Sequence, residues 1–246
     1  MKSLPSRVGL PPRAKDWRHS RLRVRRPWWT LRYAVNQFRR KANARLNPDS
    51  PWLSRAAVYN LESLVNPTAV GLEWGSGRCT IWLARRVLCF TSVEHDSGWY
   101  SRVNKELSRR RVRNVDLLLR EDEESYLGVI NDYASESLDF VLVDGGPRSA
   151  CANRAVEKVR RGGVLIIDDA HRFLPSDSRS PKARGINAGP RRTTSWEKLP
   201  GFGWADFLSR ISTWDVIWTS DGITDTAFYL RKNTGSTQSE ALNPNS

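Results

Sequence analysis

Apolar runs of strand length alternate with amphipathic helical segments through the middle of this chain, and that alternation limits its fold more than any other feature. The expected strands cover residues 69–73, 90–94, 115–119, 138–144 and 164–168. Helical periodicity lies near residues 80–87, 98–110 and 150–160. Because strands that are apolar throughout are buried on both faces, the alternation predicts an α/β fold with a doubly wound, mostly parallel sheet.

Further elements are expected on either side of this alternating region. Ser50 can cap a helix that has Pro51 at its first position and stops near Asn66 and Pro67. After the alternating region, a helix is expected at residues 204–212 and two short strands at 215–219 and 226–231.

The positive charge of the chain is concentrated at its N-terminal end. Residues 1–48 carry 14 Lys or Arg and one acid, Asp16, whereas the rest of the chain carries 26 basic and 25 acidic residues. We therefore expect a basic, partly disordered arm at 1–48, an α/β domain at 49–232 and a polar, disordered tail at 233–246. Within the domain, residues 170–200 are rich in Arg, Ser, Pro and Gly, and they predict a long basic loop.

One part of the arm has the periodicity of an amphipathic helix. Between residues 28 and 46, apolar side chains recur at three- and four-residue steps, and most of the arginines fall elsewhere on the helical wheel. Such a helix can pack over the core of the domain, lie on an anionic membrane surface or hold nucleic-acid phosphates. The sequence leaves these three alternatives open.

The loop after the first expected strand has the composition of a ligand cradle. Gly75 and Gly77 lie between that strand and the next helix, at the edge where parallel sheets bind ligands. Glu73 precedes them and would repel the pyrophosphate of a dinucleotide, whereas it suits the sulfonium and ammonium groups of S-adenosylmethionine. Glu94 ends the next strand, where an acid can accept hydrogen bonds from both ribose hydroxyls of an adenosine. The loop therefore favours S-adenosylmethionine as the cofactor.

Four segments resemble, in this order, the core of class I S-adenosylmethionine-dependent methyltransferases: LEWGSGRCT, TSVEHD, LDFVLVDGGPR and RRGGVLIIDDAHR. The resemblance covers residues 51–231 and implies a seven-stranded sheet whose last strand is antiparallel. In the glycine loop, Cys79 replaces the third glycine that many members have. The resemblance also implies a set of cofactor-binding residues: Glu73, Gly75, Ser76, Gly77, Thr80, Glu94, His95 and Glu121.

Three acids follow the fourth and fifth expected strands, where the methyl acceptor would lie. Asp144 ends one strand, and Asp168 and Asp169 end the next. Such an oxygen-rich cluster suits Mg²⁺, which would bind an acceptor hydroxyl and lower its pKa, and the layout resembles the cation-dependent O-methyltransferases. Two alternatives stay open: Asp168 and Asp169 can merely cap a buried strand, and Asp144 or His171 can act as a general base without a metal.

These features predict an S-adenosylmethionine-dependent methyltransferase that O-methylates a hydroxylated small molecule or a glycan or lipid-linked acceptor. Two other functions remain as alternatives, an RNA-directed methyltransferase and a non-catalytic protein that keeps the cofactor site. No apolar run resembles a secretory signal, and three unpaired cysteines suit a reducing compartment. We therefore expect a cytoplasmic protein, which the basic arm could bring to the inner face of a membrane.

Overall fold

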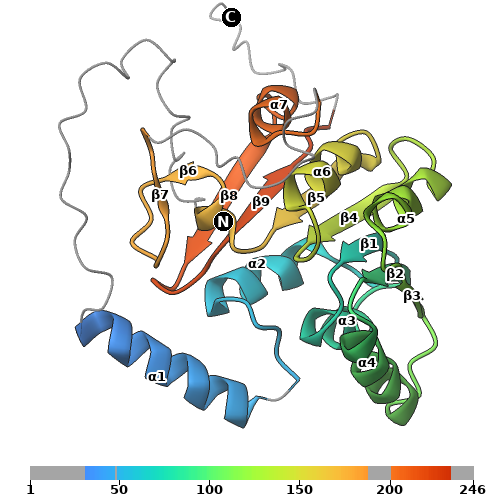
Figure 1. Cartoon of the computed structure of the whole chain (residues 1–246), viewed down its shortest axis with the longest axis horizontal. Helices are drawn as coiled ribbons and strands as arrows, with labels where there is room; N and C mark the ends of the chain where they lie inside the picture. Colours follow the sequence, from blue (N-terminus) through green and yellow to red (C-terminus); the bar gives the residue numbers. More distant parts are fainter. Residues whose placement is uncertain (1–30, 48, 188–200, 234–246) are drawn as a thin grey trace, which may run out of the picture.

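Seven strands form one sheet with the spatial order β3-β2-β1-β4-β5-β9-β8 (Figure 1). The computed structural model describes residues 31–47, 49–187 and 201–233. The strands are β1 (Val70–Trp74), β2 (Cys89–Glu94), β3 (Val115–Leu119), β4 (Leu138–Val143), β5 (Val159–Ile167), β8 (Asp215–Ser220) and β9 (Asp225–Leu230). The first five are parallel, and β9 runs antiparallel to both β5 and β8. The predicted seven-stranded, mostly parallel sheet with an antiparallel last strand is therefore confirmed.

Helices cover both faces of the sheet, as the apolar strands require. One face packs against α5 (Glu123–Gly128), the 3₁₀ helix η2 (Val129–Asp132), α6 (Arg148–Ala155) and α7 (Trp204–Arg210). The other face packs against α2 (Arg55–Leu64), α3 (Arg78–Leu83) and α4 (Ser97–Arg109). The doubly wound arrangement is therefore confirmed.

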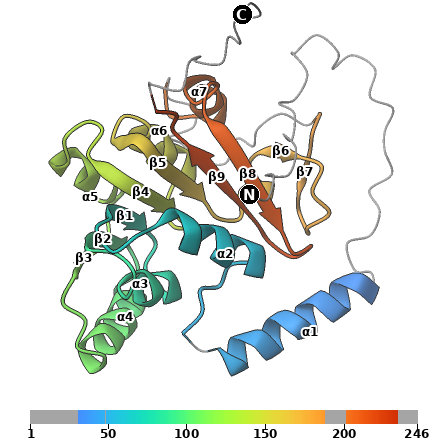
Figure 2. The ribbon, with the colours of Figure 1, turned by 180° about the vertical axis from the view of Figure 1, so that it is seen from behind.

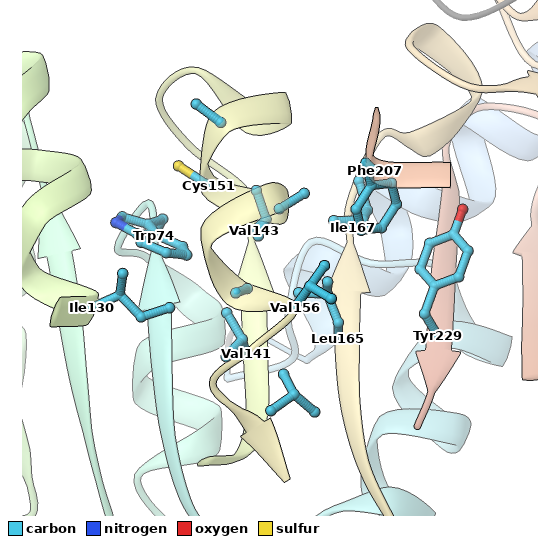
Figure 3. Packing of buried hydrophobic residues seen from close by; sticks show 14 of the residues in the cluster. Trp74, Ile130, Val141, Val143, Cys151, Val156, Leu165, Ile167, Phe207 and Tyr229 are labelled. Carbon is cyan, nitrogen blue, oxygen red and sulfur yellow. The ribbon is translucent and has the colours of Figure 1, made fainter. Parts of the chain in front are cut away.

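Large apolar side chains from the central strands fill the first of these two layers (Figure 3). Trp74, Val143 and Ile167 come from three adjacent strands, and each is fully buried. The Trp74 indole nitrogen donates to the main-chain oxygen of Tyr126 at 2.9 Å, so its one polar group is satisfied. Burying a side chain of this kind stabilises the fold by about 1.5–3 kcal/mol, and this layer holds the strand ends in fixed positions.

The start of α2 differs from the prediction. Helix α2 begins at Arg55 rather than at Pro51, and its N-cap is Ser54 rather than Ser50. The Ser54 hydroxyl oxygen accepts from the Ala57 amide at 3.1 Å, which satisfies one of the free donors of the first turn. Both serines have the chemistry of a cap, so the choice between them depends on packing.

The basic loop after β5 contains more structure than its composition predicts. A 3₁₀ turn at Ala170–Arg172 (η3) is followed by two short parallel strands, β6 (Pro175–Ser176) and β7 (Arg184–Gly185). The rest of the predicted loop, residues 188–200, lies outside the described residues, as does the predicted tail from residue 234.

Helix α1 (Leu31–Leu46) confirms the predicted helical periodicity of the arm. The predicted arm also includes residues 1–30 and residue 48, which lie outside the described part of the chain. The alternative in which the apolar side of α1 packs over the core is wrong, because Leu31 is 83% exposed and Phe38 is 74% exposed. Within the described residues, no helix has the length and apolar character needed to cross a membrane.

Candidate functional site

A cavity of about 520 Å³ opens at the carboxyl ends of β1, β2 and β4. Strand β1 lies between β2 and β4, so the chain first adds strands on one side of β1 and later adds strands on its other side. Ligands of open parallel sheets bind at such a switch point. The cavity is lined by Gly75, Ser76, Glu94, His95, Asp96, Gly98, Trp99, Arg102, Asp144 and Gly145. Five of the residues predicted for the site are therefore brought together here.

Two glycines bring the loops after β1 and β4 into direct contact at the floor of this cavity. Gly75 has a φ of 94°, and a Cβ placed on it would lie 2.6 Å from the Gly145 nitrogen. The amides of Asp144 and Gly145 both donate to the Trp74 carbonyl at 2.8 Å, which fixes the second loop on the first. Any larger side chain at Gly75 or Gly145 would separate the loops, so the cradle depends on glycine.

Glu73 shapes the glycine loop from below and does not line the cavity. Its side chain is fully buried, and its Oε2 accepts from the Thr80 hydroxyl at 2.5 Å and from the Ser92 hydroxyl at 2.7 Å. Thr80 in turn accepts from the Gly77 amide at 2.8 Å. Glu73, Gly77 and Thr80 are therefore not among the residues that line the cavity, and a chain of hydrogen bonds through them holds the loop.

The other carboxylate oxygen of Glu73 has no hydrogen-bond partner among the described residues. Burial raises the pKa of Glu73 to about 7, and the hydrogen bonds from Thr80 and Ser92 oppose that rise. A buried carboxylate with one unsatisfied oxygen lies directly beneath the glycine loop, so a positive charge bound above it would be stabilised.

Glu94 is the acid that forms a wall of the cavity, as predicted. Its Oε2 accepts from the amide and the hydroxyl of Ser76, at 3.0 and 2.8 Å. Its Oε1 accepts from the amides of His95 and Asp96, at 2.9 and 3.0 Å. A carboxylate has about four acceptor positions, and all of them are used here. A ribose hydroxyl would have to replace the Ser76 hydroxyl, which is the only one of these donors that can rotate away.

Sequence reasoning missed the aromatic wall of the cavity. The Trp99 indole nitrogen donates to the Ser76 carbonyl at 2.7 Å, and the Arg102 guanidinium lies 5.7 Å from the centre of the Trp99 ring. Asp96 caps α4 by accepting from the Trp99 amide at 2.6 Å. Asp96, two residues past the end of β2, is a typical N-cap residue, and this helix-start signal could have placed Trp99 on the first turn of α4.

Asp144 faces the cavity from the β4 side and forms an ion pair with Arg148, whose Nη2 lies 2.9 Å from its Oδ1. Arg148 also donates to the main-chain oxygens of Asp144 and Asp168. Burial, followed by the negative charge of Asp168, raises the pKa of Asp144 well above its usual range, and Arg148 opposes this rise. A partly exposed carboxylate with a raised pKa is suited to taking a proton.

The other acids predicted for the metal site have different partners. Asp168 is buried and accepts from the Thr226 hydroxyl at 2.8 Å. Asp169 accepts from Thr224 at 2.7 Å and pairs with Arg172 at 3.0 Å. The described residues contain no group of three or more acids, His or Cys arranged to hold a metal ion. The predicted Mg²⁺ site does not fit this geometry, because Arg148 already supplies the positive charge between β4 and β5.

Two other predicted residues lie away from the cavity lining. His171 is buried, and its Nδ1 accepts from the Asp225 amide at 3.2 Å. Burial lowers the pKa of His171 below its usual value. Glu121 is exposed between β3 and α5, in the acid-rich segment whose Asp122 caps that helix. Neither residue is among those that line the cavity.

Comparison with known proteins supports the fold. No protein-family model matches the sequence, and no curated protein matches it. A protein from Corynebacterium glutamicum has a similar structure, with a TM-score of 0.53 and 14% identity over 82% of this chain and 92% of that one. A Streptococcus mutans protein in complex with SAH (TM-score 0.47, 11% identity, 72% of this chain and 98% of that one) is also similar. So is an rRNA methylase from Streptococcus thermophilus (TM-score 0.48, 10% identity, 73% and 98%).

Proposed function

We propose that this chain is an S-adenosylmethionine-dependent methyltransferase that transfers the methyl group to a hydroxyl oxygen. The observation that carries the proposal is the cavity at the β1–β4 switch point, in which a glycine cradle, the wall acid Glu94 and the candidate base Asp144 face one space. Three of the four sequence segments that resemble class I methyltransferases, those at residues 72–80, 91–96 and 138–148, contribute to the lining of this cavity.

The charges of the cavity support a cationic cofactor. Glu94, Asp96 and Asp144 line it, against Arg102 in the lining and Arg148, which pairs with Asp144. The unsatisfied carboxylate oxygen of Glu73 lies beneath the loop. Such a surface attracts a sulfonium and an ammonium group and repels a pyrophosphate. Glu94 and Ser76 would hold the ribose, and the glycine cradle would let the cofactor lie close to the backbone.

The residues of the chain supply the acid–base chemistry. S-adenosylmethionine, when bound, provides a methyl group on a positively charged sulfur. The Asp144 carboxylate would take the proton of the acceptor hydroxyl, so that its oxygen could accept the methyl group. The sulfur of the cofactor would keep the electron pair of the broken C–S bond, which balances the transfer. Arg148 holds Asp144 in place and limits how far its pKa rises.

A metal ion has no part in this proposal, because Asp168 and Asp169 are held by threonines and by Arg172. A hydroxyl acceptor is favoured because a single carboxylate base suits an acidic or hydrogen-bonded O–H. The RNA alternative depends on the basic arm, most of which lies outside the described residues, and no contact in the described part favours it.

The proposal is tested with radiolabelled S-adenosylmethionine and a fractionated extract of the host. Label should appear in a small-molecule, glycan or lipid fraction and survive chelation and ribonuclease treatment. An Asp144→Asn variant should transfer little label to the same fraction. Label confined to ribonuclease-sensitive material would contradict the proposed acceptor class, and no transfer at all would contradict the proposed enzyme activity.

A further inference from the structure

Helix α1 is attached to the domain through its polar side. Asn36 donates from its side-chain amide to the main-chain oxygen of Asp221 at 2.7 Å. Arg40 donates from its guanidinium to the main-chain oxygen of Trp52 at 3.2 Å. Figures 1 and 2 show from two opposite sides that α1 lies beyond α2, away from the sheet. The polar contacts therefore determine which side of α1 faces outward.

The outward side of α1 is apolar. Leu31, Phe38 and Leu46 are 83%, 74% and 79% exposed, and Val35 is 39% exposed. At about 100° per residue, these four side chains fall within one arc of the helix, on the side opposite Arg40. Surface helices of globular domains normally turn this arc toward the core, and α1 does the reverse. Such an arrangement is costly unless the arc meets another apolar surface.

Basic side chains border this apolar arc. By the same helical spacing, Arg32 and Arg39 fall along one side of the arc, and Lys41 and Arg45 fall along the other. The 16 residues of α1 contain no acid. The thirty residues that precede α1 in the sequence add nine Lys or Arg and one acid. The partner of this face must therefore accept large apolar side chains and also carry negative charge.

We propose that α1 is a membrane-surface anchor: it lies in the plane of an anionic lipid surface, with Leu31, Phe38 and Leu46 inserted among the acyl chains and the flanking basic residues paired with lipid phosphates. Anionic lipid meets both requirements at once. A second copy of α1, or the residues before it, would bring like charges together. Nucleic acid would match the charge but would leave the leucines and Phe38 in water. This inference goes beyond the proposed reaction and does not depend on it.

The anchor is also connected to the candidate active site. Trp52, whose carbonyl holds Arg40, has its ring 6.1 Å from the ring of Trp99, which lines the cavity. The guanidinium of Arg78, at the start of α3, lies 5.3 Å from the Trp52 ring. Trp52 thus links helix α1 to Trp99 in the cavity wall. A lipid-bound α1 would therefore hold the site close to the membrane surface.

The test is co-sedimentation of the full chain with vesicles of phosphatidylcholine, alone or mixed with phosphatidylglycerol. We expect binding to the mixed vesicles, weakening with added salt, and little binding to phosphatidylcholine alone. The double variant Leu31→Ser with Phe38→Ser should reduce partitioning by at least about tenfold, because its apolar insertion is lost. Leu88→Ser removes another exposed leucine, 56% exposed but outside α1, and serves as the matched control with unchanged partitioning.

Three outcomes would overturn the inference. The first is equal binding of the double variant and the wild type to the mixed vesicles. The second is self-association, seen by sedimentation equilibrium, that the double variant abolishes while vesicles do not bind. The third is binding to polyuridylate but not to vesicles. Because both substituted residues are exposed, the melting temperature should not change, and this measurement separates loss of binding from loss of folding.

Discussion

The β1–β2 side and the β4–β5 side of the cavity each carry a pair of strand-end acids, yet within each pair only one acid reaches the cavity. Glu94 and Asp144 line it, whereas Glu73 and Asp168 do not. Each buried acid accepts from hydroxyl groups of neighbouring strands or helices, Glu73 from Thr80 and Ser92 and Asp168 from Thr226. Position at a strand end therefore brings an acid near the site but does not by itself place it in the lining.

The largest effect is expected at the acid that faces the acceptor. Asp144→Asn keeps an oxygen for Arg148 but removes the base, so we expect methyl transfer to fall by about 10²–10⁴-fold. Binding of S-adenosylmethionine, measured by calorimetry, should change little. Asp169→Asn is the control, since Asp169 does not line the cavity, and its transfer rate should stay close to that of the wild type. Equal losses in the two variants would remove the distinction between acids that line the cavity and acids that do not.

The buried acid of the other pair should affect stability as a function of pH. The pKa of Glu73 is raised from 4.5 to about 7 by burial, so the folded state binds more protons than the unfolded state between these values. Stability therefore falls as pH rises through this window, by at most about 3 kcal/mol. Glu73→Gln cannot ionise, so urea titrations at pH 5 and pH 8 should differ less for the variant. An unchanged pH dependence would show that Glu73 is not the group responsible.

Glu94→Gln tests the cavity-lining acid of the cofactor side. The neutral amide keeps one acceptor oxygen but loses the charge, and hydrogen bonds to a charged group contribute about 1.5–3 kcal/mol. We expect S-adenosylmethionine to bind about 10–100-fold more weakly in calorimetry. Glu121→Gln is the matched control, because Glu121 is an exposed acid at the end of β3 that does not line the cavity. Equal weakening in the control would indicate a general charge effect rather than a contact.

The smallest effect is expected at the aromatic wall. Trp99→Phe keeps a ring in the cavity but removes the hydrogen bond to the Ser76 carbonyl. A neutral hydrogen bond contributes about 1 kcal/mol, so binding of S-adenosylmethionine should weaken about fivefold. A loss as large as that of Glu94→Gln would mean that the wall, rather than the acid, holds the cofactor.

Much of the fold could be predicted because its strands are long apolar runs with clear ends. The strand at 115–119 was predicted with its observed bounds, and most of the other strand ends lie within one residue. The strand β5 is the exception, since it begins at Val159 through the charged Arg160 and Arg161, which show no apolar pattern. Helix α5 was also missed, because it has only six residues and one turn of apolar contacts.

The site could be predicted only in part. Gly75, Ser76, Glu94, His95 and Asp144 line the cavity as predicted because strand ends and the first loop fix their positions. The metal prediction failed because Arg148, the first residue of α6, lies four residues after Asp144 and its guanidinium pairs with the Asp144 carboxylate. The outward side of α1 could not be predicted at all, since an apolar stripe shows that a helix has two sides and not which of them meets the domain.

The central claim is that the cavity binds S-adenosylmethionine because its acids favour a cation and reject a pyrophosphate. Calorimetric titration of the wild-type chain with S-adenosylmethionine, and separately with NAD, tests this most directly. We predict one-to-one binding of S-adenosylmethionine and no binding of NAD under the same conditions. Equal or tighter binding of NAD, or no binding of S-adenosylmethionine, would contradict the assignment of the cavity.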